Sequence, residues 1–171
     1  MKQFNHENFP SIHIQLLDGA NTEQIEAFKQ LLINTNDYFT AYTDHTPSTA
    51  EAKKFFTSLP TNTSASQKYM YGIFDDKKLI GFIDWIEDTP EKGTGIIGEF
   101  VLEKEYRGTD LANQLYKALE KTVSDTGTDT IELLCPVPNT VARYFFEKED
   151  FMTKEVTKTD TYEQILFVKH I

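Results

Sequence analysis

The hydrophobic and polar positions divide the chain into short segments with either two-residue or helical spacing. Alternation over Ser11–Leu17 predicts a first strand. Apolar residues at helical spacing then predict a helix over Glu23–Ile33, with Asn21 or Thr22 as its N-cap. A second helix is predicted over Ser48–Leu59, because this segment opens with the Ser-x-x-Glu spacing of a capping box. The first third of the chain is therefore predicted to be one strand followed by two helices.

The middle of the chain has the spacing of strands. Three of them are predicted, over Lys68–Phe74, Leu79–Ile86 and Gly95–Leu102. Only the short turn Asp75–Lys78 separates the first two, so we expect them to form an antiparallel hairpin.

The remaining segment alternates helices and strands. Helices are predicted over Leu111–Val123 and Asn139–Lys148, and strands over Ile131–Cys135 and Thr161–Lys169. The predicted order is thus β-α-α-β-β-β-α-β-α-β, an α/β arrangement. The sequence has no internal repeat and no long linker, so residues 1–171 are expected to form a single domain.

Composition and charge exclude several classes of function. The chain has 27 acidic and 17 basic side chains, a formal net charge of −10, and its lysines do not cluster, which argues against nucleic-acid binding. No apolar run approaches the ~20 residues that span a bilayer, so no membrane contact is expected. Cys135 is the only cysteine, so an intramolecular disulfide and a thiolate metal site are excluded. We expect a cytoplasmic protein, monomeric or homodimeric and without a metal, whose negative field attracts cationic amines.

The most informative segment runs from Gly98 to Leu119. A strand leads through a short connection into Arg107-Gly108-Thr109-Asp110-Leu111-Ala112 at the start of a helix. Backbone N–H groups converge at such a turn and bind anions, and Arg107 adds a positive charge. The segment lacks the Gly-Lys-Ser/Thr of a phosphate loop and the three glycines of a dinucleotide site. It therefore fits a phosphate- or pyrophosphate-binding site of a different type.

These residues resemble the acyl-CoA-binding motif of the GCN5-related N-acetyltransferase (GNAT) superfamily, Arg/Gln-x-x-Gly-x-Gly/Ala. Arg107 matches its first position and Ala112 its last. The segment from Asn139 and Ala142 through Phe145-Phe146-Glu147-Lys148 to Phe151 is similar to the superfamily's second block. The resemblance implies a GNAT-type fold, with a mixed, mostly antiparallel, splayed sheet flanked by helices. It also implies transfer of an acetyl group from acetyl-CoA, as co-substrate, to the primary amine of a small molecule or peptide.

The resemblance assigns roles to individual residues. Glu99 would be the general base, and Asn139 would face the pantetheine or thioester region. The segment Asp37–His45 would lie at the acceptor pocket. Backbone atoms would bind the cofactor at Phe100, Val101, Leu102, Arg107, Gly108, Thr109, Asp110, Leu111 and Ala112.

Two departures from the superfamily pattern keep an alternative open. Asp110 stands where a glycine is usual, and Phe146 stands where a proton-donating tyrosine is frequent. In this alternative, Asp110 is a helix cap at a site that no longer binds phosphate, Asn139 is only a helix cap, and Glu99 is a solvated charge at the end of a strand. The alternative function is a catalytically weakened or inactive domain that binds acyl-CoA or an interaction partner.

Overall fold

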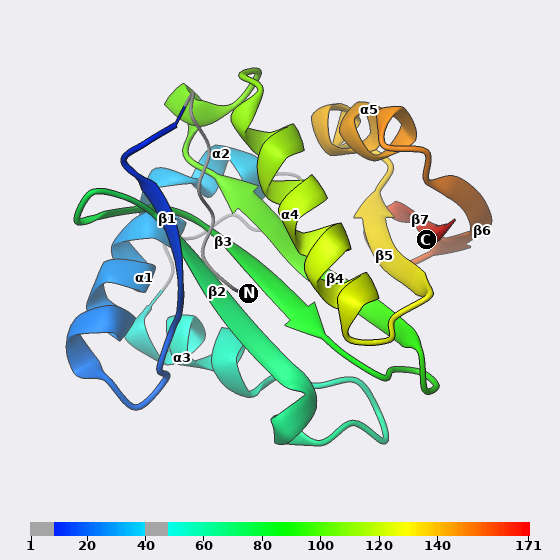
Figure 1. Ribbon diagram of the computed structural model, residues 1–171, viewed down its shortest axis with the longest axis horizontal. Helices are drawn as coiled ribbons and strands as arrows, with labels where there is room; N and C mark the ends of the chain where they lie inside the picture. Colours follow the sequence, from blue (N-terminus) through cyan, green and yellow to red (C-terminus); the bar gives the residue numbers. More distant parts are fainter. Residues whose placement is uncertain (1–8, 40–47) are drawn as a thin grey trace.

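A computed structural model describes residues 9–39 and 48–171, which form one mixed sheet flanked by helices (Figure 1). The sheet has the order β1-β2-β3-β4-β5-β7-β6. Its strands within these residues are β1 (Ile12–Leu16), β2 (Lys68–Asp75), β3 (Lys78–Ile86), β4 (Thr94–Leu102), β5 (Thr130–Pro136), β6 (Met152–Lys158) and β7 (Glu163–His170). The helices are α1 (Thr22–Asn34), α2 (Asn36–Phe39), α3 (Thr49–Thr57), α4 (Leu111–Asp125) and α5 (Thr140–Lys148).

The pairing of β4 with β5 differs from the rest of the sheet. These two strands are parallel, whereas the other neighbouring pairs are antiparallel. Their pairing covers only Thr94–Ile96 of β4 against Thr130–Glu132 of β5, after which the strands diverge. The predicted α/β fold with a splayed, mostly antiparallel sheet is confirmed.

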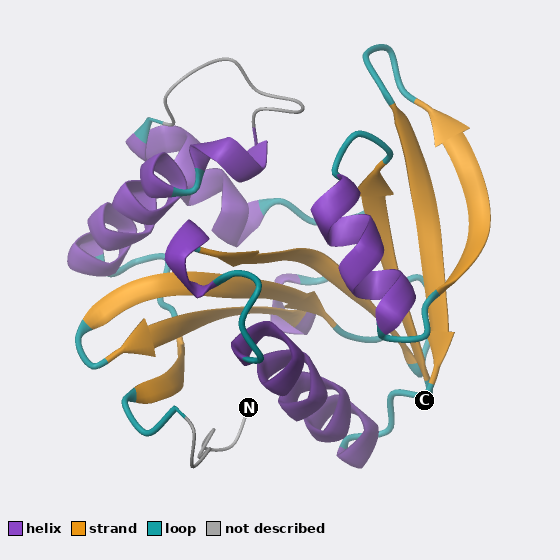
Figure 2. Cartoon of the chain, turned by 90° about the horizontal axis from the view of Figure 1, so that it is seen from above, coloured by secondary structure: helices purple, strands orange, loops and turns teal. Residues whose placement is uncertain are grey.

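Two apolar clusters cover the two faces of the sheet, and Figure 2 shows helices on both sides of it. Alternate residues of β2, β3 and β4, such as Met70, Phe82 and Val101, pack against α1 and α3. The opposite face packs against α4, whose buried residues are Leu111, Leu115, Tyr116, Leu119 and Val123. Helix α5 lies beside the diverging ends of β4 and β5, so the opening in the sheet is flanked by helices.

Local sequence signals explain where the helices begin. The Asn21 side chain accepts hydrogen bonds from the first turn of α1, and Ser48 forms the predicted capping box with Glu51. The predicted hairpin of β2 and β3 is confirmed, with Asp76 at a φ of 50° in its turn. An aspartate tolerates this left-handed conformation better than most residues.

Two elements, α2 and β6, were absent from the sequence prediction. Helix α2 has four residues, which is too short to show a helical period. Strand β6 lies at the edge of the sheet, and nearly all its side chains are exposed, including Met152 and Val156. An edge strand without a buried face has no alternation of polar and apolar residues that would reveal it.

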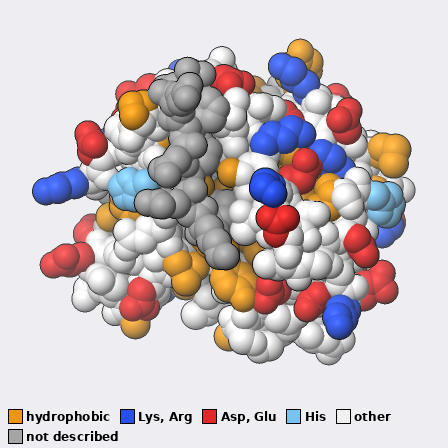
Figure 3. All heavy atoms as spheres, in the orientation of Figure 1, with side chains coloured by type: hydrophobic (Ala, Val, Ile, Leu, Met, Phe, Trp, Pro, Cys, Tyr) orange, Lys and Arg blue, Asp and Glu red, His pale blue; other side chains and the backbone are white. Residues whose placement is uncertain are grey.

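Figure 3 shows acidic and basic side chains interspersed over one face of the molecule. None of the helices within residues 9–39 and 48–171 has both the length and the apolar character needed to cross a bilayer.

Candidate active site

Two cavities meet where β4 and β5 diverge. The larger has a volume of about 620 Å³ and is lined by residues of α2, β4, the start of α4 and α5. The smaller, of about 180 Å³, lies between β4, β5, α2 and α5. Tyr38, Phe100, Ala142 and Phe146 line both, so a ligand in one cavity can contact a ligand in the other.

The larger cavity contains the predicted anion-binding turn. Arg107, Gly108 and Ala112 line it, where the chain leaves β4 and enters α4. Gly108 has a φ of 70°, in the region that favours glycine, and the Thr109 hydroxyl closes the turn by donating to the Tyr106 carbonyl. The N–H groups in the first turn of a helix lack intrahelical acceptors, so this end of α4 can bind an anion.

Arg107 is anchored at both sides of its guanidinium. Its Nε donates to the Leu102 carbonyl at 2.7 Å. Its two terminal nitrogens donate to the Asp37 carboxylate at 2.6 and 3.1 Å, and the group lies 5.9 Å from the centre of the Tyr38 ring. The Arg107 hydrogen bonds lower the pKa of Asp37 below its usual value. Asp37 lines the same cavity. The Arg107 guanidinium, which the sequence analysis assigned to phosphate binding, is therefore hydrogen-bonded to a carboxylate.

Asn139 caps α5 and also lines the larger cavity. Its Oδ1 accepts a hydrogen bond from the Ala142 amide at 3.1 Å and so caps α5. Its Nδ2 is buried and donates to no atom of the described residues, although the side chain lines the larger cavity. A buried amide donor without an acceptor is costly, and a ligand carbonyl would satisfy it.

The other predicted cofactor residues lie at different depths. Phe100 and Leu102 line the larger cavity, whereas Val101 and Leu111 are buried in the two cores. The exposed Asp110 carboxylate accepts a hydrogen bond from Gln114 at 2.7 Å. Thr109, Asp110 and Leu111 are outside the lining of the cavity, and Asp110 makes no side-chain cap of α4.

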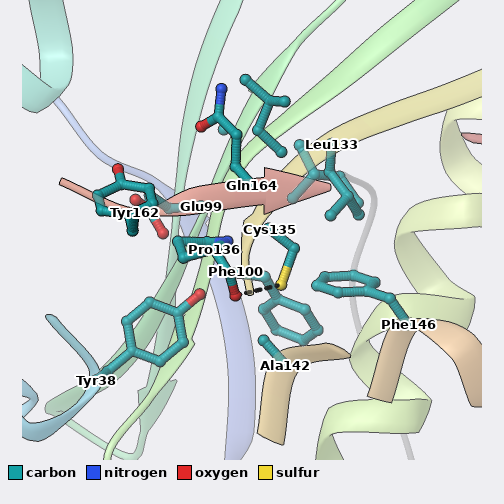
Figure 4. A pocket seen from close by; sticks show the side chains of 13 residues that line it. Tyr38, Glu99, Phe100, Leu133, Cys135, Pro136, Ala142, Phe146, Tyr162 and Gln164 are labelled. Atoms are coloured by element: carbon teal, nitrogen blue, oxygen red, sulfur yellow. Dashed lines mark hydrogen bonds between the residues drawn. The ribbon is translucent and has the colours of Figure 1, made fainter. Parts of the chain in front are cut away.

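Glu99 lies on the smaller cavity, on the same side as Tyr38 and Tyr162 and opposite Phe146 (Figure 4). Burial raises the pKa of Glu99 to about 8, and the nearby Asp84 carboxylate adds to this effect. A hydrogen bond with Tyr38 and the charge of Lys68 act in the opposite direction. Glu99 is therefore a carboxyl group with a raised pKa that lies at the wall of a cavity.

Phe146 and Cys135 border the cavities, whereas Tyr144 lies outside their lining. Phe146 is buried between both cavities, whereas Tyr144 points outward with 69% of its surface exposed. Cys135 is buried beside the smaller cavity, and burial raises the pKa of its thiol to about 12. Neither Phe146 nor Tyr144 can donate a proton into the site.

Several residues of the site were missed in the sequence. Tyr162, just before β7, and Gln164, within β7, line the smaller cavity. Lys68 and Asp84 form a buried ion pair next to Glu99. Asp84 interrupts an otherwise apolar strand, and this charged position is the feature of the sequence that could have indicated the ion pair. Of the predicted acceptor segment Asp37–His45, residues 40–45 lie outside the described part of the chain.

The fold is shared with solved acetyltransferases. An acetyltransferase from Thermus thermophilus superposes with a TM-score of 0.74 at 14% identity, covering 95% of this chain and 99% of that one. An acetyltransferase from Salmonella typhimurium, described as modifying the N-terminal serine of ribosomal protein L7/L12, gives 0.75 at 17%, with 94% and 95% covered. PaiA N-acetyltransferase from Thermoplasma acidophilum, in complex with coenzyme A, gives 0.69 at 17%, with 94% and 99% covered.

At these identities the likeness establishes the fold. A search of curated protein sequences finds no match. The model of the Acetyltransferase (GNAT) family matches residues 29–151, which include α4, α5, Glu99 and the turn at Gly108. Because this match spans more than half of the chain, the protein belongs to the GNAT acetyltransferase family, whose activity is acyl transfer.

Proposed function

We propose that the protein transfers an acetyl group from acetyl-CoA to the primary amine of a small molecule or a peptide. The observation that carries this proposal is the meeting of two cavities with different chemistry. Arg107, Gly108 and Asn139 line the larger one, whereas Glu99 lines only the smaller one. This arrangement supports an anionic cofactor on one side and an amine beside a proton acceptor on the other.

The residues of the larger cavity fit acetyl-CoA. The turn at Gly108 and the start of α4 would hold the pyrophosphate, and the Asn139 Nδ2 would donate to a carbonyl of the pantetheine arm. Beyond Ile96, β4 has lost its pairing with β5, so the backbone at Phe100–Leu102 would bind the arm as an added strand. The bound thioester supplies an acyl group that an amine attacks directly.

The residues of the smaller cavity would manage the proton. Glu99 accepts the proton of the attacking amine, directly or through water, and Tyr38 orients its carboxylate. Backbone N–H groups of β4 near the divergence stabilise the charge that develops on the carbonyl oxygen. Phe146 provides no acid, but a thiol with a pKa of ~8.5 leaves readily near neutral pH and takes its proton from water.

The acceptor is proposed to be a slender amine that carries positive charge. A cavity of about 180 Å³ lined by Tyr38, Tyr162 and Gln164 has room for an unbranched amine or the first residue of a peptide. The net charge of −10 favours a cationic partner. The Salmonella neighbour, which modifies an N-terminal serine, supports a peptide amine as one form of this acceptor.

Cofactor binding is tested first, by thermal unfolding with and without acetyl-CoA. At ~100 times its dissociation constant the ligand adds ~2.7 kcal/mol to the free energy of unfolding, which raises the melting temperature measurably. An unchanged melting temperature at millimolar CoA contradicts the cofactor assignment.

Transfer is tested by release of free CoA thiol, with mass spectrometry of the product, on polyamines and on peptides with free or blocked N-termini. Glu99→Gln is expected to lower the rate by ~10²-fold or more at neutral pH with CoA affinity preserved. Glu26→Gln, on the exposed face of α1, is the control and should keep the wild-type rate. If CoA binds but no amine is acetylated, the protein is instead an acyl-CoA-binding domain without activity.

A further inference from the structure

Lys68, Asp84 and Glu99 form a row across three neighbouring strands. Asp84 of β3 is the direct cross-strand partner of Glu99 of β4, and also of Met70 of β2. Lys68 precedes Met70 by two residues, so its side chain lies on the same face of the sheet. Directly opposite side chains on neighbouring strands are ~5 Å apart at Cβ, which brings the two carboxyl groups close together.

The Lys68–Asp84 pair is buried and closely bonded. The Lys68 Nζ lies 2.7 and 2.6 Å from the two Asp84 carboxylate oxygens. Only 4% of the lysine side chain and 9% of the aspartate side chain are exposed. Taking two such charges out of water costs several kcal/mol per ion, so a buried ion pair is weak evidence of a contribution to stability. Its place beside Glu99 suggests a different role.

The sheet is shaped to accommodate this pair. Asp84 pairs with Glu99 and Trp85 with Ile97, which leaves Gly98 as the extra residue of a β-bulge. A Cβ atom at Gly98 would lie 2.7 Å from the Asp84 Oδ2. The Asp84 carboxylate therefore packs against the backbone of the bulge, next to Glu99. Any residue other than glycine at position 98 would require a shift of this carboxylate.

We propose that the Lys68–Asp84 pair is a positioning element for Glu99, which fixes the orientation of this carboxyl group and the electrostatic field in which it exchanges its proton. This inference rests on the proposed function of Glu99 as the base. The charge of Asp84 raises the pKa of Glu99, and the charge of Lys68 lowers it. The described titratable groups around Glu99 are Tyr38 of α2, Cys135 of β5, Tyr162 just before β7, and Lys68 and Asp84 themselves.

The pair acts on catalysis through the readiness of Glu99 to accept a proton. A carboxyl group that titrates near the pH of the reaction is a stronger base than one with an ordinary pKa, because base strength rises with pKa. Asp84 and burial move Glu99 in this direction. Burial raises the pKa of Asp84, and Lys68 acts against this by favouring the ionised form of its carboxyl group.

The test follows the ionisation of Glu99 itself, by carbon NMR of protein labelled at the glutamate carboxyl carbons. The Glu99 signal is assigned by its loss in Glu99→Gln. In Asp84→Asn, Lys68 is left facing Glu99 alone, so the titration midpoint should fall by roughly one pH unit or more. Adding Lys68→Met removes that attraction, so the midpoint of the double variant should rise again. The double variant contains no unpaired buried charge from the pair, which protects its folding.

Lys154→Met is the matched control. Lys154 of β6 forms an ion pair of 2.6 Å with the buried Glu132 of β5, although the lysine side chain itself is 54% exposed, and its loss should leave the Glu99 midpoint unchanged. A midpoint that is unchanged or higher in Asp84→Asn, or that does not rise in the double variant, overturns the proposal. The NMR measurement needs no acetyl transfer, so a protein that acetylates no amine refutes the proposed function alone. In an active enzyme, the acidic limb of kcat/KM should follow the same order of variants.

Discussion

The ion pair between Asp37 and Arg107 leads to a prediction about cofactor affinity. Both side chains line the larger cavity, and Asp37 occupies the two terminal nitrogens of the guanidinium. A cofactor phosphate must compete with this carboxylate and also meets its negative charge. Asp37→Asn removes both effects, so we expect it to bind CoA more tightly than the wild-type protein does.

The size of the effect follows from the exposure of the pair. The two hydrogen bonds, of 2.6 and 3.1 Å, are close and bidentate, but 47% of the Asp37 side chain and 22% of the Arg107 side chain are exposed. Exposed ion pairs contribute ~0.2–1 kcal/mol after screening by water. Because ~1.4 kcal/mol corresponds to a tenfold change in Kd, the expected gain in affinity is at most about fivefold.

Isothermal titration calorimetry at low salt, where exposed charges are least screened, measures this difference. Asp125→Asn is the control, because it also removes one negative charge from an exposed ion pair, with Lys121, at the far end of α4. Its affinity for CoA should match that of the wild-type protein. Weaker binding in Asp37→Asn would show that the carboxylate organises Arg107 for phosphate instead of competing with it. An equal gain in the control would reduce the effect to net charge.

Three further predictions concern single residues of the site. Asp110→Gly should tighten CoA binding in calorimetry, because it removes a negative charge near the phosphates. The loss of an acidic residue at the start of α4 should also lower the free energy of unfolding by ~0.3–1 kcal/mol. An unchanged affinity for CoA would show that Asp110 does not oppose the cofactor. Phe146→Tyr should leave the single-turnover acetyl-transfer rate unchanged or modestly higher, and a large increase would show that an acid had been missing. Because Glu99 has its pKa raised to about 8, its protonated form stabilises the fold at low pH, and this contribution is lost as the pH rises from the ordinary glutamate value towards 8. Denaturant unfolding should therefore show Glu99→Gln gaining stability over wild type by up to ~1.4 kcal/mol per pH unit in that window, and a constant difference would refute the assignment.

The sequence predicted the fold wherever a residue pattern has a local cause. The capping box at Ser48, the hairpin turn and the apolar stripe of α4 each act within a few residues. The start of α4 and the cap at Asn139 were found for the same reason. Strand β6 was missed because its side chains face solvent on an edge, where burial imposes no pattern.

The surroundings of the proposed base depend on contacts that a linear pattern does not contain. Asp84 and Glu99 meet because of the register between β3 and β4, and the bulge at Gly98 shifts that register by one residue. Tyr38 reaches Glu99 from a four-residue helix far away in the chain. A charged residue inside an apolar strand indicates that a partner exists, but the fold alone identifies which residue it is.

The early separation of β4 from β5 also has a consequence for the exposure of strand edges. Among residues 9–39 and 48–171, the backbone of β4 from Ile97 onward pairs as a strand only with β3, so it is an open strand edge in the middle of the sheet. Open edges at the rim of a sheet invite strands from other molecules and promote aggregation. Here the edge faces cavities that are lined by Tyr38 of α2 and by Ala142 and Phe146 of α5, so helices stand beside it. The unpaired hydrogen-bonding groups of β4 thus lie within a cavity between helices, and not at the rim of the sheet where β1 and β6 stand.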